Sequence, residues 1–196
     1  MKKSYLMRNF NWVENLIFLL ILGILIDFLL KFGQKMGVMI FPEHLKSLFD
    51  VVILNVTQIL KILVLVILLS MIPEIMKRLM KDKLKNLADS IHGTLVFRRF
   101  LKQYQPSAST GDEMISITEN HAISKFNRSV HHAVLELSES EIRLYIKVPQ
   151  SSQAQKILKE HEVQIKEEIS NLYPEYLIST FERRKHHLWL MGTKRK

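Results

Sequence analysis

Two long apolar stretches, separated by a short polar segment, dominate the first half of the chain. Residues 12–32 and 48–72 are mostly apolar, and each holds a charge in its interior, Asp27 in the first and Lys61 in the second. A helix that spans a membrane needs about 20 predominantly apolar residues. The pattern therefore predicts two transmembrane helices.

The polar residues inside these spans are candidates for function. A charge near the middle of a membrane helix costs on the order of 3 kcal/mol on insertion scales, and it usually faces a partner or water. In an antiparallel hairpin, Lys61 lies at a depth from which it can reach Asp27, within one subunit or between subunits. Thr57 and Gln58 share the side of Lys61, and Asn55 lies near its edge. We expect these five residues to form a polar stripe, either as contacts between helices or as a water-filled path.

Basic residues beside the spans predict their orientation. Lys2, Lys3 and Arg8 precede the first span, and residues 77–85 hold five more Lys/Arg, whereas the loop between the spans holds fewer. Positive charge beside a span tends to stay in the cytoplasm. We therefore expect a protein of the inner (plasma) membrane with both termini cytoplasmic. Much of the net charge of +9 lies in residues 74–105, so anionic membrane lipid is an expected partner.

Beyond Pro73 the apolar residues recur at spacings typical of a helix. They are Met76, Met80, Leu84, Leu87, Ile91 and Leu95. This predicts a basic amphipathic helix over residues 74–105, which either lies in the membrane interface or packs as a stem against copies of itself. Residues 105–112 are small, polar and helix-breaking, which is typical of a linker.

The remaining residues, 106–196, have nearly balanced charge and the patterning of a small soluble domain. Alternating apolar residues predict a strand hairpin from 134 to 148, a helix follows from 152 to Pro174, and residues 176–191 predict a second hairpin with its turn at 183–185. For residues 114–130 we expect a short strand and then a helix from Thr118.

These elements define the expected fold class. It is a membrane α-helical hairpin of two transmembrane helices (residues 1–73) joined to a small cytoplasmic α/β domain of the α+β type. The domain has an antiparallel sheet in ββαββ-like order. We expect residues 106–196 to form the part that senses a ligand.

Signatures of catalysis are absent from the sequence. It has no Gly-rich phosphate loop, no Gly-x-Ser-x-Gly motif and no His-Glu-x-x-His motif. Zero cysteines exclude thiolate metal sites and a cysteine nucleophile. Neighbouring residues on a strand point to opposite faces, so neither of the adjacent histidine pairs can chelate a metal by itself. We expect no enzyme activity, no catalytic residues, no metal and no cofactor.

Basic side chains nevertheless gather at two places in this domain. The set is Lys125, Arg128, His131 and His132 before the first hairpin, and Arg183, Arg184, Lys185, His186 and His187, with Trp189 nearby, in the second. Such a cluster is either a solvated turn or an anion site. Arginine binds phosphate through paired hydrogen bonds, and aromatic rings stack on bases, so a nucleotide or oligonucleotide suits this mixture best.

In its architecture the chain resembles the membrane effectors of type III CRISPR defence, above all the small Csx-type effector with two spans and a soluble domain. The residues that carry the resemblance are the two spans, the basic segment after them and the basic, histidine-containing face. The resemblance implies antiviral function, a homo-oligomer that is a tetramer, and a cyclic oligonucleotide second messenger, cyclic tetra-adenylate, as the ligand. Because anionic lipid accounts for much of the basic charge, we expect no duplex nucleic acid among the partners.

Two other functions are compatible with the same sequence. One is a membrane-anchored adaptor or assembly factor whose soluble domain binds a protein partner. The other is a small transporter or channel subunit without a cytoplasmic ligand. Toxicity that depends on a nucleotide signal favours the effector, whereas a protein that co-purifies stably favours the adaptor.

Overall fold

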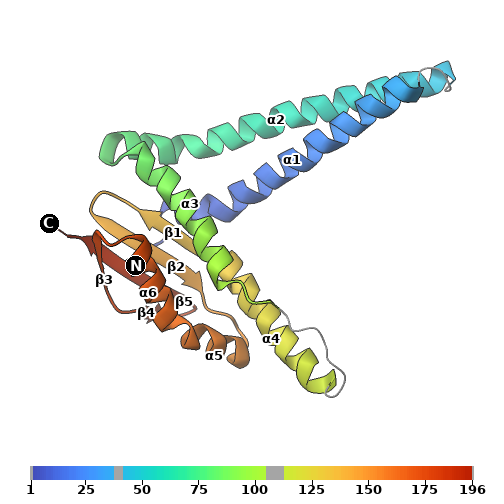
Figure 1. Cartoon of the computed structure of the whole chain (residues 1–196). Coiled ribbons are helices and arrows are strands. Elements are labelled where there is room, and N and C mark those ends of the chain that lie inside the picture. Colours follow the sequence, from blue (N-terminus) through green and yellow to red (C-terminus); the bar gives the residue numbers. More distant parts are fainter. Residues whose placement is uncertain (1, 38–41, 105–112, 196) are drawn as a thin grey trace. The chain divides into compact units, whose positions relative to one another are not determined.

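A computed structural model describes residues 2–37, 42–104 and 113–195. It contains two compact units. One comprises residues 8–76, and the other combines residues 77–196 with residues 1–7 at the start of the chain (Figure 1).

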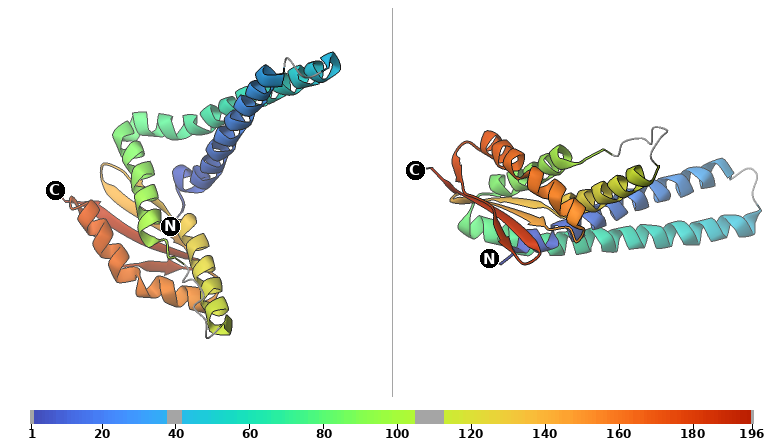
Figure 2. Two further views of the ribbon diagram at one scale, coloured as in Figure 1. Left: turned by 45° about the vertical axis from the view of Figure 1, so that its right-hand side comes forward. Right: turned by 90° about the horizontal axis from the view of Figure 1, so that it is seen from below.

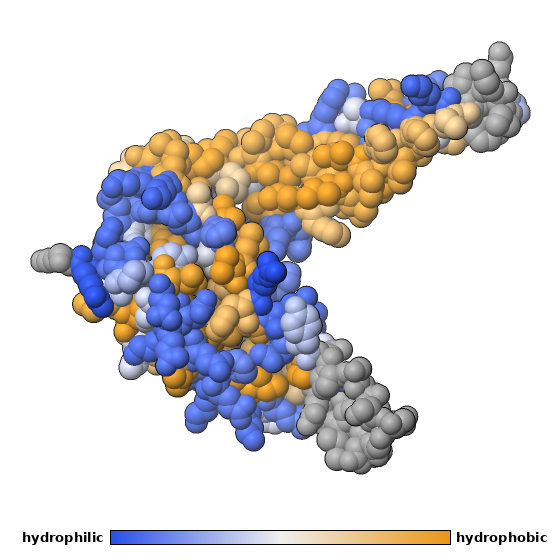
Figure 3. Space-filling view, in the orientation of Figure 1, coloured by the Kyte–Doolittle hydropathy of each residue, from blue (hydrophilic) through white to orange (hydrophobic). Residues whose placement is uncertain are grey.

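The first unit is a pair of antiparallel helices, belonging to α1 (Tyr5–Gly37) and α2 (Glu43–Lys81). Gly23 of α1 lies so close to Leu60 of α2 that a Cβ on the glycine would come within 2.6 Å of the leucine side chain. Both helices are long and apolar enough to cross a membrane. On the face seen in Figure 3 the middle of the hairpin is mostly apolar, and hydrophilic residues appear toward its far end. Pro73 lies inside α2 and does not end it.

The second unit packs four helices on an antiparallel sheet. The helices are α3 (Leu84–Leu101), α4 (Glu113–His131), α5 (Ser152–Glu160) and α6 (Glu162–Leu172). The strands are β1 (Val134–Leu137), β2 (Glu141–Lys147), β3 (Tyr176–Ile178), β4 (Glu182–Arg184) and β5 (His187–Lys194). The strand order is β1-β2-β5-β3, and β4 also pairs with β5, on the side away from β2.

One face of the sheet forms the hydrophobic core with the helices (Figure 2). Apolar residues alternate along β2 and β5 so that Ile142, Leu144, Ile146, Leu188 and Leu190 point toward the helices. The helices contribute Phe97, Leu101, Phe126, Val130, Ala154, Leu158, Ile165 and Ile169. The opposite face of the sheet carries the alternate residues, and it is this face that holds the charged side chains described below.

Helix α3 covers the outer edge of the sheet with polar side chains. Strand β1 is an edge strand, so the backbone groups that point away from β2 need other partners. The Thr94 hydroxyl accepts from the Leu135 N–H (3.0 Å), and its one proton lies within reach of the Ser90 carbonyl (2.7 Å) and the Leu135 carbonyl (3.1 Å). The Ser90 hydroxyl accepts from Leu137 N–H at 2.8 Å, and Arg98 Nε donates to the Ala133 carbonyl at 2.8 Å.

The expected single helix over residues 74–105 is divided into two helices. Helix α2 ends at Lys81, and a separate helix, α3, begins at Leu84. Of the predicted apolar face, Leu87 is buried, whereas Met80, Leu84 and Leu95 are exposed. The side of α3 that packs on the sheet contains small and polar residues that the hydrophobic pattern does not register.

The domain elements follow the sequence prediction with three corrections. The first hairpin is confirmed. Residues 114–117 are helical as part of α4, so the expected strand there is wrong. The predicted single helix is divided at His161 into α5 and α6. The turn of the second hairpin lies at Lys185 and His186, with Lys185 at a φ of 55°, while Arg183 and Arg184 belong to β4.

Candidate functional site

Three basic side chains form a row across the sheet, on the face opposite the core. Lys147 of β2 lies directly opposite His187 of β5, and His187 lies directly opposite Arg184 of β4. Residues that face each other across strands project from the same side of a sheet. We call Lys147, His187 and Arg184 the cation row. Lys147 and Arg184 are the charged members of the row, and Arg184 also pairs with Glu182 on the same face of β4 at 3.2 Å.

The row continues toward α4 around an open hollow of about 400 Å³. Its lining includes Lys125, Arg128 and His132 from α4 together with Lys147 from the end of β2. Burial lowers the pKa of His132, and the nearby charge of Lys147 lowers it further. The two basic groups predicted separately, one on α4 and one in the second hairpin, are thus brought to the same end of the sheet with Lys147 between them.

Within the row, His187 contacts the side chain of Tyr145. The Tyr145 hydroxyl lies 3.1 Å from His187 Nδ1, and burial raises the pKa of Tyr145 to about 12. The phenol therefore stays protonated, and its O–H can donate a hydrogen bond to Nδ1 of a neutral imidazole. Burial, followed by the charge of Lys3, lowers the pKa of His187 and favours that neutral form.

The start of the chain contacts the same place. Lys3 Nζ lies 3.9 Å from the centre of the Tyr145 ring, at cation–π distance. Burial and the charge of Lys147 lower the pKa of Lys3. Lys3 therefore adds another basic group beside the row, because it contacts Tyr145 and Tyr145 contacts His187. Lys3 lies two residues before the start of α1.

Other residues predicted for the anion site lie elsewhere. Arg183 projects from the opposite face of β4 to Arg184, and its Nη2 donates to Gln155 Oε1 of α5 at 3.1 Å. There it lines a second hollow of about 260 Å³, together with Lys156 and Lys159. Trp189 is buried and packs edge-on against Tyr145, so its ring is not at the surface for a base to stack on.

The remaining predicted residues lie near the row but outside it. Lys185 and His186 form the exposed turn between β4 and β5, and the His186 carbonyl accepts from the Val148 N–H at 2.9 Å. His131 is exposed at the end of α4, with its ring edge toward His132. Within the described part of the chain, no three His, Asp or Glu side chains converge as a metal site.

Sequence reasoning missed Lys147 and Lys3. The signal for Lys147 is its position at the end of an alternating strand, on the side away from Ile146 and Val148. Its neighbours across the sheet depend on strand register, which the sequence does not specify. Lys3 contributed only to the expected orientation, and nothing local in the sequence indicates its contact with Tyr145.

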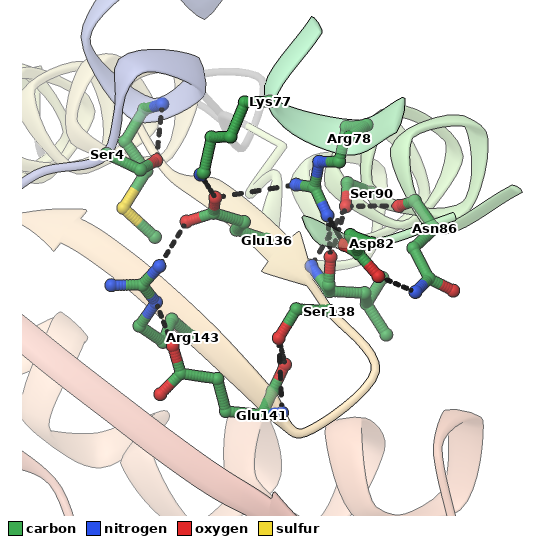
Figure 4. Close-up of polar contacts among 12 residues, drawn as sticks. Ser4, Lys77, Arg78, Asp82, Asn86, Ser90, Glu136, Ser138, Glu141 and Arg143 are labelled. Atoms are coloured by element: carbon green, nitrogen blue, oxygen red, sulfur yellow. Dashed lines mark hydrogen bonds and ion pairs between the residues drawn. The ribbon is translucent and has the colours of Figure 1, made fainter. Parts of the chain in front are cut away.

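A second polar cluster attaches the end of α2 to the sheet (Figure 4). Glu136 of β1 is only 2% exposed, and three cations surround it. Lys77 lies 3.3 Å from it, Arg78 3.4 Å and Arg143 3.1 Å. Arg78 is itself 1% exposed, pairs with Asp82 and donates to the Leu137 carbonyl at 2.6 Å. We call Glu136 with its three cations the Glu136 cluster.

Within the helical hairpin, the expected polar stripe is divided between two sides. Asp27 accepts from Thr57 at 3.1 Å and pairs with Lys31 at 2.6 Å, so its partner within the hairpin is not Lys61. Gln58 and Lys61 are exposed on the surface of the hairpin, and so is Asn55. A contact of Lys61 with Asp27 from another copy stays a prediction.

No protein-family model, no curated protein and no solved structure shows significant similarity to this chain.

Proposed function

We propose that this protein is a ligand-gated membrane effector whose folded unit binds a phosphate-bearing anion at the cation row. The observation that carries the proposal is the juxtaposition of Lys147, His187 and Arg184 across three strands, beside a hollow lined by further cations of α4. Charge-assisted hydrogen bonds to phosphate oxygens are about twice as strong as neutral ones. The resemblance to Csx-type effectors suggests cyclic tetra-adenylate as the specific ligand, and a homo-oligomer as the active form.

In this proposal the ligand acts on the membrane helices through two sets of contacts, one just before the start of α1 and one near the end of α2. The cation row adjoins Tyr145, which Lys3 contacts just before α1. The Glu136 cluster holds Lys77 and Arg78 in the last turns of α2. A ligand that binds one arrangement of these contacts more tightly shifts the population toward it, and a change from 1:99 to 99:1 requires about 5.5 kcal/mol of preference.

In this proposal α1 and α2 cross the inner membrane with both termini in the cytoplasm, and the rearrangement opens, reorders or thins the bilayer. The positive charge on the flanks of the spans supports that orientation.

The test is a binding titration with the full-length protein in lipid nanodiscs. Cyclic tetra-adenylate is compared with its linear form, ATP and inorganic phosphate. We expect Lys147→Ala and Arg184→Ala each to weaken the binding of cyclic tetra-adenylate by about 1–3 kcal/mol, because each removes a charge-assisted hydrogen bond. Added salt should weaken binding as well.

The matched control is Lys194→Ala, which removes the same charge from the far end of β5. Arg183→Ala should also have less effect than Arg184→Ala, because Arg183 lies on the other face of β4. Equal affinity in all four variants would remove the cation row from ligand binding. Equal affinity for inorganic phosphate and cyclic tetra-adenylate would support an anion site at the cation row. It would contradict the proposal that the specific ligand is a nucleotide. No binding of any anion, together with a protein that co-purifies stably, would favour the adaptor.

A further inference from the structure

The outer side of α3 carries an apolar stripe that the described residues leave partly exposed. Leu84, Ala88, Ile91 and Leu95 recur at spacings of four, three and four residues, which puts them on one side of the helix. Leu84 and Leu95 are each nearly half exposed, at 47% and 48%. The core needs the other side of α3, where Leu87, Phe97 and Leu101 are buried, so the stripe is not a packing surface of this unit.

Basic side chains follow the stripe along one flank. Lys85, His92 and Arg99 are exposed and are spaced by seven residues, which aligns them in a second row next to the apolar one. The last turn of α2 adds exposed side chains of the same two kinds, Leu79 and Met80 with Lys81.

We propose that this face of α3, together with the last turn of α2, lies in the headgroup region of an anionic bilayer. Exposed apolar residues with basic residues beside them match the two halves of a lipid interface, acyl chain and negative headgroup. A second copy is a poorer occupant, because an antiparallel pair of these faces brings the two basic flanks together, with Lys85 of one copy near Arg99 of the other. Helix α2 is apolar enough to span a membrane, and α3 follows it after a short connection in the sequence. This face of α3 therefore comes soon after a segment that can lie in a bilayer. The proposal does not depend on any ligand at the cation row.

The absence of native cysteine allows a direct test with single labels. Leu95→Cys carries an environment-sensitive fluorophore on the proposed face. Val163→Cys is the matched control, because Val163 is an exposed apolar residue on α6. Each full-length protein is reconstituted in vesicles of phosphatidylcholine and phosphatidylglycerol that contain brominated lipid. We expect lipid to quench the label at position 95 about threefold more than the label at 163.

Charge provides the second measurement. Quenching at position 95 should fall in vesicles of phosphatidylcholine alone, and it should fall in anionic vesicles when Arg99→Glu is added. Circular dichroism checks that the variants stay folded. Equal, water-like emission from both labels would overturn the proposal. So would rapid disulfide cross-linking of Leu95→Cys between copies without quenching by lipid, because a second copy would then cover the face.

Discussion

Glu136 shows how much depends on one buried carboxylate. At 2% exposure, water contributes little to stabilising the charge of this carboxylate. Ion pairs with Lys77, Arg78 and Arg143 stabilise it instead. Removing one partner from a buried ion pair leaves the others uncompensated, which costs about 3–5 kcal/mol. The residue therefore matters both for the stability of the sheet and for the attachment of α2 to it.

We predict that Glu136→Gln lowers the free energy of unfolding by about 3 kcal/mol. Glu139→Gln, in the turn after the same strand, removes an exposed pair with Lys83 and should cost less than about 1 kcal/mol. Unfolding of the full-length protein can be followed by the fluorescence of the buried Trp189, with Trp12→Phe as the background. Equal losses in the two variants would show that burial of Glu136 does not determine its contribution.

Two histidines, His187 of the cation row and His132 of the hollow beside it, make folding stability depend on pH. The pKa values of His132 and His187 are lowered from 6.5, in both cases by burial first and then by a nearby lysine. Below pH 6.5 the unfolded chain binds protons that the folded chain does not, so folding stability falls as the pH decreases. Stability that is fully present above 6.5 is lost progressively until the pH reaches the lowered values.

We predict that the unfolding temperature falls between about pH 7.5 and pH 5.5, and that His132→Asn reduces this fall. His121→Asn, at an exposed histidine of α4, serves as the control for loss of a histidine away from the hollow. A wild-type unfolding temperature that rises over this range would contradict the sign of both shifts. An unchanged profile in His132→Asn would assign the effect to other groups.

At this scale the sequence identified the right residue types but not their faces. Lys125, Arg128, His132, Arg184 and His187 were predicted as a basic surface, and the structure brings them to one end of the sheet. The sequence groups Arg183 with Arg184, whereas the structure puts them on opposite faces of β4, because neighbouring strand residues project to opposite sides. Trp189 was predicted as a surface ring because sequence gives no measure of how deeply a residue of β5 is buried.

At the scale of elements, α3 shows a polar solution to an edge strand. An exposed edge pairs readily with other chains, and here Ser90, Thr94 and Arg98 occupy its backbone groups. Their spacing of four residues puts all three on one side of the helix. Gly93 permits the close approach, since a Cβ there would collide with the side chains of Tyr173 and Leu135.

We predict that Thr94→Val lowers the free energy of unfolding by about 1–3 kcal/mol, because Leu135 keeps its buried N–H and carbonyl without the hydroxyl. Thr94→Ser retains the hydroxyl and should restore most of the loss. The comparison separates the hydrogen bonds from packing, since valine keeps the shape of threonine and serine does not. If valine is tolerated and serine is not, the methyl group and not the hydroxyl holds α3 to β1.

The elements that sequence predicted well are those defined by local apolar pattern, namely the two long helices and the β1–β2 hairpin. The pattern failed on α3 because a side built from Ser, Thr, Gly and Arg reads as solvent-exposed. It also failed to divide α5 from α6 at His161, since apolar residues keep a helical spacing across the break. Contacts between distant segments decide both cases.

At the scale of the whole molecule, the exposed polar groups of the helical hairpin bear on the proposed membrane effector. Asp27 has partners inside its own hairpin, Thr57 and Lys31, whereas Gln58 and Lys61 are exposed on the outer surface. Near the middle of a membrane span a lysine is costly against lipid, and such residues usually face a bundle interior or water. In the proposed effector, an assembly of several hairpins would supply that environment.

We predict that Lys61→Leu suppresses dye leakage from liposomes in the presence of cyclic tetra-adenylate, while the protein remains inserted. Lys46→Leu removes the same charge near the start of α2, outside residues 48–72, and should leave leakage unchanged. A Gln58→Cys variant should form disulfide cross-links between copies, because Gln58 lies on the same exposed surface as Lys61. Wild-type leakage in Lys61→Leu would remove this residue from the permeation step. Efficient cross-linking despite that result would still place Gln58 between copies, and the polar residues would then hold the assembly together and not conduct.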